Sequence, residues 1–377
     1  MVLGTASGHI LCVVGARPNF MKIAPVIRAF KEISPAITYR LLHTGQHYDA
    51  AMKQSFFDQL GIPEPDIDLG VGSGSHAVQT AEIMKRFEPE LDNNPPRAVL
   101  VVGDVNSTIA CSLVAVKKGI PVIHVEAGLR SGDRSMPEEI NRILTDQLSD
   151  LLFTTERDAE SNLVREGIDR ERVHFVGNVM IDSLHHNLDK AIPAAQTLNE
   201  IASTPRKLKE YGLLTLHRPS NVDDPKTLRA LLQVLSEISA DLPLIFPLHP
   251  RTENRIKQAG LEQLIASSNI SLCPPFNYLQ MLGILKDSQL VLTDSGGIQE
   301  ETTALGIPCI TLRESTERPI TVTQGTNTIV GTDAEQIRSV FRQTRETGGK
   351  AGCIPEYWDG QAAPRIAAKI ASWLDQH

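Results

Sequence analysis

The feature that most constrains the fold of this chain is a regular alternation of short apolar runs with amphipathic helical patterns. The apolar runs, such as Ala98–Val102 and Leu290–Thr293, are rich in Val, Leu and Ala at consecutive positions rather than at every second one. Strands that are apolar on both faces are typical of parallel sheets covered by helices on both sides. The alternation therefore predicts an α/β protein with doubly wound parallel sheets.

The alternation occurs twice along the chain, which predicts two domains. Residues 191–210 separate the two halves; this segment is polar and carries Pro193 and Pro205. A length of 377 residues also favours two domains, each with its own core. We expect a first domain at 1–190, a second at 205–361, and a final amphipathic helix at 362–377 that packs back on the first. Strand-like runs are expected at 10–14, 39–42, 98–102, 121–125, 151–153, 173–175, 212–216, 242–246, 270–272, 290–293 and 308–311.

Composition excludes several functional classes. The formal net charge is −8, so no global basic field attracts nucleic acid. The five cysteines are scattered without the spacing of a zinc site, which favours a reduced compartment. The chain shows neither a secretory signal pattern nor an apolar run long enough to cross a membrane, so no membrane partner is expected.

The motif Asp294-Ser295-Gly296-Gly297 follows an apolar run and precedes a helical pattern. Backbone N–H groups at a helix N-terminus point outward unpaired, and the helix dipole favours an anion there. Two glycines let a diphosphate approach the main chain, and Glu301 lies one turn further on, where it suits a ribose diol. The motif predicts a nucleotide-linked ligand, with an ordinary strand-to-helix turn as the alternative.

Charged residues gather at the expected ends of other strands, where ligands of parallel sheets bind. The first half offers acids together with cations, and the second half offers His217 and Arg218 beside the glycine turn. Asp104 taken alone also suits a helix N-cap. One domain is therefore expected to hold a nucleotide diphosphate while the other performs proton chemistry. The residues of the first half are Arg17, Lys22, Asp104, Glu126 and Glu138.

Taken in order, motifs along nearly the whole chain resemble the non-hydrolysing UDP-N-acetylglucosamine 2-epimerases. The resemblance implies two Rossmann-like domains of the glycosyltransferase-B type facing a cleft, without metal or NAD, usually in a homodimer. It also implies reversible conversion of UDP-N-acetylglucosamine to UDP-N-acetylmannosamine in the cytoplasm, upstream of surface polysaccharides. The implied mechanism is elimination of UDP to give 2-acetamidoglucal, followed by re-addition of UDP. The motifs lie at 15–22, 46–47, 103–104, 124–130, 137–142, 217–218, 294–301 and 316–319.

The resemblance also implies a role for each matching residue. Asp104, Glu126 and Glu138 match the catalytic carboxylates of the family, and His217 matches its catalytic histidine. Contacts to the nucleotide sugar are expected from Arg17, Lys22, Arg130, Arg218, Phe276, Met281, Ser295, Gly296, Gly297, Glu301 and Arg318.

The chain departs from the family pattern at positions that bear on substrate and regulation. Asn19 stands where relatives often have Glu, and Pro219-Ser220 replaces an Arg-Glu pair. Some members bind a second UDP-N-acetylglucosamine as an activator, with candidate contacts here at Gln46, His47 and His249. Pro219 has no guanidinium to hold a second diphosphate, so we expect turnover without an activator.

Alternative activities remain open at this point. The same motifs suit a 2-epimerase of a related UDP-diacetamido-uronic acid. A UDP-sugar glycosyltransferase would share the fold, although it would not need Asp104, Glu126 and Glu138 together. A hydrolysing epimerase would instead release free N-acetylmannosamine.

Overall fold

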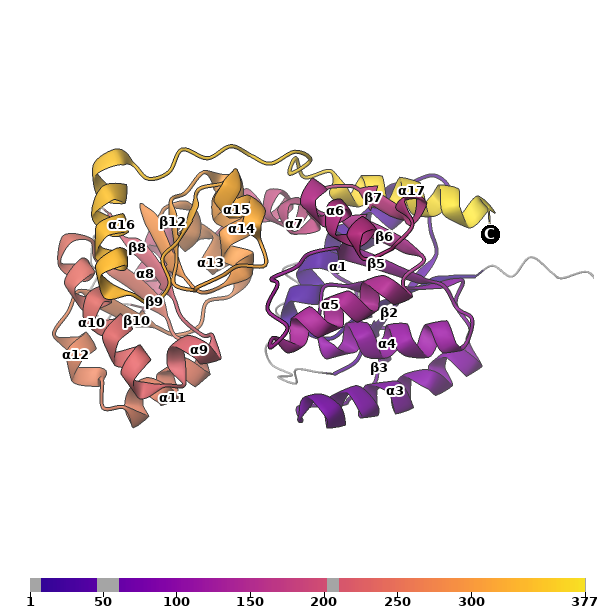
Figure 1. Cartoon of the computed structure of the whole chain (residues 1–377), viewed down its shortest axis with the longest axis horizontal. Helices are drawn as coiled ribbons and strands as arrows, with labels where there is room; N and C mark the ends of the chain where they lie inside the picture. The colour runs from indigo at the N-terminus through magenta and orange to yellow at the C-terminus, as the bar shows by residue number, and fades with distance from the viewer. Residues whose placement is uncertain (1–7, 46–60, 202–209, 377) are drawn as a thin grey trace, which may run out of the picture. The chain divides into compact units, whose positions relative to one another are not determined.

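The computed structural model describes residues 8–45, 61–201 and 210–376. The chain divides into two compact units, Met1–His186 with Glu356–His377, and Asn187–Pro355. Each unit is a parallel sheet covered by helices (Figure 1). The predicted α/β class with two doubly wound sheets is confirmed.

The first unit contains a seven-stranded sheet in the order β3-β2-β1-β4-β5-β6-β7, and every pair is parallel. The strand order reverses between β1 and β4, and ligands of such sheets bind at this kind of switch point. The strands are β1 (Ile10–Val14), β2 (Tyr39–His43), β3 (Ile67–Asp68), β4 (Ala98–Val102), β5 (Val122–Ala127), β6 (Leu151–Thr154) and β7 (Val173–Phe175).

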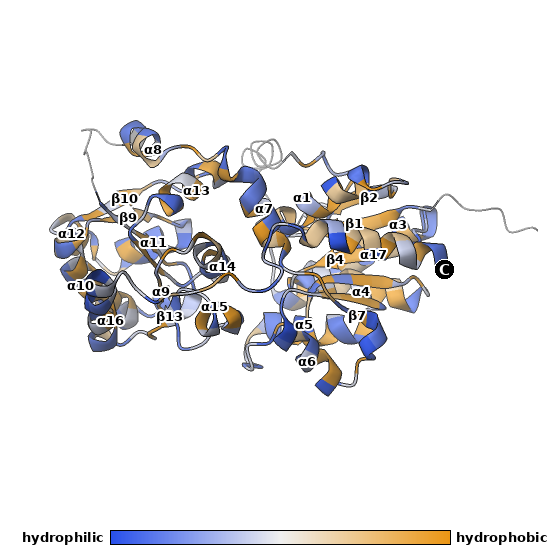
Figure 2. Cartoon of the chain, turned by 90° about the horizontal axis from the view of Figure 1, so that it is seen from above, coloured by the Kyte–Doolittle hydropathy of each residue, from blue (hydrophilic) through white to orange (hydrophobic). Residues whose placement is uncertain are grey.

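Helices of the first unit pack on these apolar strands, which form the hydrophobic centre of the unit (Figure 2). Leu11 and Val13 of β1 cluster with Ile83 and Phe87 of α3. Alternate side chains of a strand point to opposite faces, so Cys12, also fully buried, faces the other helical layer. The helices are α1 (Arg17–Glu32), α3 (His76–Asn93), α4 (Asn106–Lys117), α5 (Pro137–Leu148), α6 (Arg157–Arg165), η1 (Arg170–Arg172), α7 (Val179–Leu188) and α17 (Ala362–Gln376).

The last helix, α17, belongs to the first unit and lies against α1. The buried carboxylate of Asp182 accepts hydrogen bonds from the backbone N–H groups of Ala362 and Ala363 at 3.1 and 2.7 Å. These are free N–H groups of the first turn of α17, which need an acceptor when they are buried. The segment before the helix is anchored by Trp358, whose buried indole N–H donates to the carbonyl of Thr155 at 3.3 Å.

The second unit contains a six-stranded parallel sheet in the order β10-β9-β8-β11-β12-β13. Its strands are β8 (Gly212–Thr215), β9 (Leu244–Pro247), β10 (Ile270–Cys273), β11 (Leu290–Thr293), β12 (Cys309–Thr311) and β13 (Asn327–Ile329). Its helices are α8 (Ala194–Ile201), α9 (Pro219–Val222), α10 (Pro225–Asp241), α11 (Pro250–Gln258), α12 (Glu262–Ala266), α13 (Tyr278–Lys286), α14 (Gly296–Leu305), α15 (Pro319–Thr323) and α16 (Ala334–Thr347).

The sequence predicts the central strands and the edge strands β7 and β10, but it misses the other two edge strands. Strands β3 and β13 were not expected, because each has only two or three residues and no apolar run. The apolar periodicity of residues 23–31 predicts a helix there, but α1 begins earlier, at Arg17. Pro18 occupies its first turn, where a missing N–H costs nothing. The pattern of residues 50–60 also predicts a helix, and this segment lies outside the described residues. Within the parts of the chain that are described, no helix has the length and apolar character needed to cross a membrane.

Gly283, in the middle of α13, gives a prediction about stability. A Cβ at this position would lie 1.7 Å from the carbonyl oxygen of Ile192, which belongs to the same unit. Gly283→Ala should therefore lower the thermal midpoint, although alanine is favoured over glycine in helices by about 1 kcal/mol. We expect a net loss of roughly 2 kcal/mol because the clash involves backbone and forces a shift of packed elements.

The matched control is Ser339→Ala on α16, where the side chain is exposed and the helix preference acts without a clash. Circular dichroism should show a small gain in midpoint for this control. An equal gain for Gly283→Ala would contradict the packing described here.

Candidate active site

Glu126 and Lys22 form a buried ion pair at the carboxyl edge of the first sheet. Glu126 lies within β5 rather than after it, with a φ of 75°, and the register of β5 with β6 shifts between Val125 and Ala127. A left-handed backbone is rare for Glu, and such conformations cluster at functional sites. The ammonium of Lys22 lies 2.5 Å from Glu126 Oε2, and both side chains are buried. Lys22 thus contacts a predicted catalytic acid directly.

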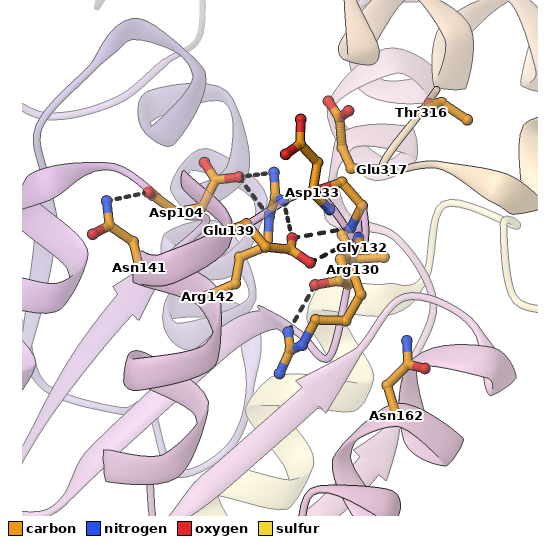
Figure 3. Close-up of polar contacts among 12 residues, drawn as sticks. Asp104, Arg130, Gly132, Asp133, Glu139, Asn141, Arg142, Asn162, Thr316 and Glu317 are labelled. Carbon is orange, nitrogen blue, oxygen red and sulfur yellow. Dashed lines mark hydrogen bonds and ion pairs between the residues drawn. The ribbon is translucent and has the colours of Figure 1, made fainter. Parts of the chain in front are cut away.

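Asp104 lies at the end of the neighbouring strand, β4, and pairs with Arg142 of α5. Its Oδ2 accepts hydrogen bonds from Arg142 Nε at 2.9 Å and Nη2 at 2.6 Å (Figure 3). The alternative that Asp104 is a helix N-cap is wrong, because α4 has Val105 at that position. Glu138 occupies the first turn of α5 and is half-buried, and it makes no ion pair or hydrogen bond with any described residue.

Asn19, which replaces the Glu of many relatives, has a structural role here. Its Oδ1 accepts the backbone N–H groups of Gly15 and Ala16 at 3.1 and 2.9 Å, and its Nδ2 donates to the carbonyl of Val102 at 2.9 Å. The side chain therefore ties the turn after β1 to the end of β4. A carboxylate has no N–H to donate to that carbonyl, so Asn suits this position better than Glu.

Arg130 and Asp146 belong to a second polar cluster in the first unit. Arg130 donates to Glu166 at 2.8 and 2.6 Å, and its Nη2 also lies 2.8 Å from the buried Asp146. Asp146 in turn accepts from His124 Nδ1 at 2.7 Å. The guanidinium predicted to bind nucleotide sugar is thus held by two carboxylates of its own unit. The sequence did not single out Asp146, which lies in an ordinary amphipathic helix.

Asp294 organises the corresponding edge of the second unit. Its buried carboxylate accepts the backbone N–H groups of His217 and Arg218 at 3.0 and 2.9 Å and the side-chain N–H of Asn221 at 3.2 Å. It also lies 2.9 Å from His217 Nδ1. Burial alone would raise the pKa of Asp294, but His217 and the backbone donors hold that pKa below its ordinary value.

The imidazole of His217 is oriented by this contact. An ionised carboxylate only accepts hydrogen bonds, so the Nδ1 of His217 must carry the proton that faces Asp294. Nε2 is then the ring nitrogen that can meet a ligand. The His217 side chain is 39% exposed, so that nitrogen has access to one.

The glycine turn forms the expected helix N-terminus. Strand β11 ends at Thr293, Ser295 is the N-cap residue, and α14 begins at Gly296. A Cβ at Gly296 would lie 2.5 Å from Glu317 Oε1, so a larger residue would have to displace this carboxylate. Nothing lies within 4 Å of the corresponding point at Gly297, where space is open.

Glu317 gathers arginines beside that turn. It is buried and pairs with Arg313 at 2.7 Å and with Arg218 at 3.2 Å. Burial would raise the pKa of Glu317, but these guanidinium groups and Arg318 hold that pKa well below its usual range. Since Glu317 is shared by both arginines, positive charge remains in local excess next to a helix N-terminus. Arg318 lies 2.8 Å from Glu300 of α14. Sequence reasoning missed Arg313, although it follows β12 by two residues, just as His217 follows β8.

The remaining predicted contacts of the second unit lie within a helix, in a buried apolar cluster or at a helix end. Glu301 is buried, and burial together with this carboxylate raises the pKa of Tyr278. Phe276 is part of a buried apolar cluster of the second unit, and Met281 packs against it. His249 caps α11 by accepting the N–H of Arg251 at 3.2 Å, and its ring lies 6.1 Å from that of His217.

Some predictions cannot be placed. The side chain of Arg17 is not among those described, and Gln46 and His47 lie outside the described residues. In the described ranges, no group of three or more His, Cys, Asp or Glu residues is arranged to hold a metal ion.

The family model described as UDP-N-acetylglucosamine 2-epimerase matches residues 30–371 of the chain. The protein belongs to this family. The UDP-N-acetylglucosamine 2-epimerase of Methanocaldococcus jannaschii is 42% identical over 86% of this chain and 89% of its own. The UDP-2,3-diacetamido-2,3-dideoxy-D-glucuronate 2-epimerase of Pseudomonas aeruginosa is 41% identical over 96% of this chain and 99% of its own.

Solved structures agree with this assignment. The Methanocaldococcus jannaschii UDP-GlcNAc 2-epimerase in complex with UDP-GlcNAc and UDP has a TM-score of 0.87 and 38% identity, over 97% of this chain and 99% of its own. The Neisseria meningitidis enzyme bound to UDP-GlcNAc has a TM-score of 0.84 and 31% identity, over 98% and 100%. The predicted family is confirmed.

Asp294→Asn should destabilise the protein in a pH-dependent way. The folded pKa of Asp294 is lowered, so its ionised form contributes stability above the unfolded pKa of about 3.9, and this contribution is lost as the pH falls through the folded value. At pH 7 we expect a loss of roughly 3 kcal/mol, because a buried charge network loses an acceptor. Urea unfolding from pH 7 to pH 3 should show the gap to wild type narrowing below about pH 4. A gap that stays constant would show that Asp294 is not held ionised.

Proposed function

We propose that this protein interconverts UDP-N-acetylglucosamine and UDP-N-acetylmannosamine without an added cofactor. The observation that carries the proposal is the full-length similarity to enzymes of this activity, one of them solved with UDP-GlcNAc and UDP. The acids at the strand ends of the first unit and the anion-attracting turn of the second support it. The domain assignment from sequence, 1–190 with the helix at 362–377 and then 205–361, is part of this proposal.

The chemistry of the reaction requires positive groups near the diphosphate and carboxylates near the sugar. The C2 hydrogen of the sugar is not next to a carbonyl, so a base alone faces a very high barrier. Breaking the anomeric C–O bond first places positive charge on the ring and acidifies that hydrogen. Elimination of UDP then gives 2-acetamidoglucal, and protonation from the opposite face followed by re-addition of UDP gives the epimer. Positive groups must stabilise the leaving diphosphate, and carboxylates must move the proton.

We assign the residues to these tasks as follows. The first-turn N–H groups of α14, with Arg218, Arg318 and His217, receive the diphosphate. Glu301 holds the ribose hydroxyls. Proton transfer and stabilisation of the ring cation are assigned to Asp104, Glu126 and Glu138. The remaining nucleotide-sugar contacts are Arg17, Lys22, Arg130, Phe276, Met281, Ser295, Gly296 and Gly297.

A second candidate substrate is a UDP-diacetamido-uronic acid. The observation that favours it is the Pseudomonas aeruginosa relative, which is as similar as the UDP-N-acetylglucosamine enzymes and aligns over 99% of its own length. Both substrates would use the same elimination and re-addition, so the same residues serve either one.

The proposal also assigns the protein to the cytoplasm and to the synthesis of surface polysaccharides.

The reaction can be tested by proton NMR in D₂O. UDP-N-acetylglucosamine should be converted to UDP-N-acetylmannosamine with solvent deuterium at C2, because the proton removed exchanges before re-addition. The diacetamido-uronic acid should be offered in parallel, and the faster reaction identifies the substrate. Free N-acetylmannosamine, or product without deuterium at C2, would refute this mechanism.

The three carboxylates give a second test of the mechanism. Asp104→Asn, Glu126→Gln and Glu138→Gln should each lower kcat by about 10² to 10⁴, the usual range for general acid–base groups. Affinity for UDP, measured by calorimetry, should change little, because UDP binding is assigned to the other unit. Wild-type turnover in any of these variants would remove that residue from the mechanism.

We also propose a homodimer. Adjacent helices α3, α4 and α5 each carry an exposed large apolar side chain, namely Val78, Val116 and Leu144, and partners commonly cover such groups. Light scattering should give twice the chain mass of 41.3 kDa. Val78→Glu should shift the mass towards the monomer, whereas Val164→Glu, an exposed valine on α6, serves as the control. A monomeric wild type would refute the proposal.

A further inference from the structure

Arg142 of α5 connects two carboxylates in the interior of the first unit. On one side, its Nε and Nη2 both donate to Asp104 Oδ2, at 2.9 and 2.6 Å. On the other side, its Nη1 donates to Glu139 Oε2 at 2.7 Å. The arginine and Glu139 are almost fully buried, and the Asp104 side chain is 22% exposed.

Glu139 is itself fixed, so Arg142 has a rigid support. Its two oxygens accept the backbone N–H groups of Ser131 and Gly132 at 3.0 and 2.9 Å. Burial would raise the pKa of Glu139, but these N–H groups and Arg142 hold that pKa below its ordinary value. A buried guanidinium held by an ionised carboxylate has little freedom to move, because breaking such a pair leaves an uncompensated buried charge.

Asp104 is held in an asymmetric way. Both donors of Arg142 engage Oδ2, and Asn141 Nδ2 donates to the Asp104 backbone carbonyl at 2.9 Å. Within the described part of the chain, Oδ1 accepts no hydrogen bond. One oxygen of the carboxylate is thus fixed from the protein side, while the other keeps its lone pairs available.

We propose that Arg142, supported by Glu139, is the positioning residue that orients Asp104 so that Oδ1 faces the reacting sugar. The proposal rests on the assignment of Asp104 to proton transfer under the proposed function. Arg142 acts through Asp104 and does not itself touch substrate. Consecutive helical residues are turned by about 100°, so Glu138 and Glu139 point in different directions. Glu138 is assigned to contact the substrate, whereas Glu139 supports Arg142.

The reason for an arginine is geometric. A lysine retains the positive charge, but its single ammonium on a flexible stem cannot hold Asp104 Oδ2 with two fixed donors while reaching Glu139. A catalytic group displaced by about 1 Å can lose on the order of 10²-fold in rate. Arg142→Lys should therefore lower kcat by about 10²-fold, with KM and the UDP dissociation constant within about twofold of wild type.

A double-mutant cycle separates positioning from a general structural role. C2 deuterium incorporation should be measured for wild type, Arg142→Lys, Asp104→Asn and the double variant, at stoichiometric enzyme so that slow exchange is followed over hours. If Arg142 acts through Asp104, adding Arg142→Lys to Asp104→Asn should cost no more than about twofold. Equal losses in both backgrounds, or an Arg142→Lys rate close to wild type, would overturn the inference.

Two further variants test the support that Glu139 gives to Arg142 and provide a control. Glu139→Gln retains the shape of the support but cannot accept from all its donors, and it should lower kcat about tenfold with KM unchanged. Arg165→Lys, an exposed arginine on α6 of the same unit, should leave turnover within about twofold of wild type. Thermal midpoints exclude unfolding, and a Glu139→Gln variant with full turnover would overturn the supporting role. Wild-type protein that shows no C2 exchange would refute the proposed function itself. The cycle distinguishes this outcome, because the wild type is measured separately from the variants.

Discussion

The candidate site depends on buried carboxylates that fix the turns following parallel strands. Asp294 is the main example. It lies in the turn after β11, and its oxygens accept two backbone N–H groups of the turn after β8, so the two turns are tied together. A charge of this kind is tolerated inside the protein only when its acceptor sites are filled. The same contacts that satisfy Asp294 therefore also fix the position of His217, whose ring it orients.

The two units handle charge in different ways. In the first, the acids have specific cations, since Lys22 pairs with Glu126 and Arg142 pairs with Asp104. In the second, Glu317 is shared by two guanidinium groups next to the N-terminus of α14. The first arrangement holds carboxylates in fixed orientations, and the second leaves positive charge for an anion. This difference matches the proposed reaction, in which carboxylates of the first unit move the proton of the sugar. Cations of the second unit take up the leaving diphosphate.

Much of the fold and the general location of the site follow from local sequence. The β11–α14 turn was predicted from an apolar run, two glycines and a helical pattern, and each of these is a short-range signal. Edge strands β3 and β13 were missed because pairing with a neighbour, rather than composition, makes them strands. Asp104 resembled an N-cap in sequence, and only the position of α5 shows that Arg142 takes its oxygen.

By itself, the sequence determined the α/β class, the two sheets, the family and the residue types that gather at strand ends, because these depend on periodicity and on ordered motifs. The tertiary structure decided which charges meet. Arg142 is 38 residues from Asp104, and His217 is 77 residues from Asp294, so no local pattern connects either pair. Long-range partners are brought together only when the sheet order places distant strands side by side, and that order is set by packing across the whole unit.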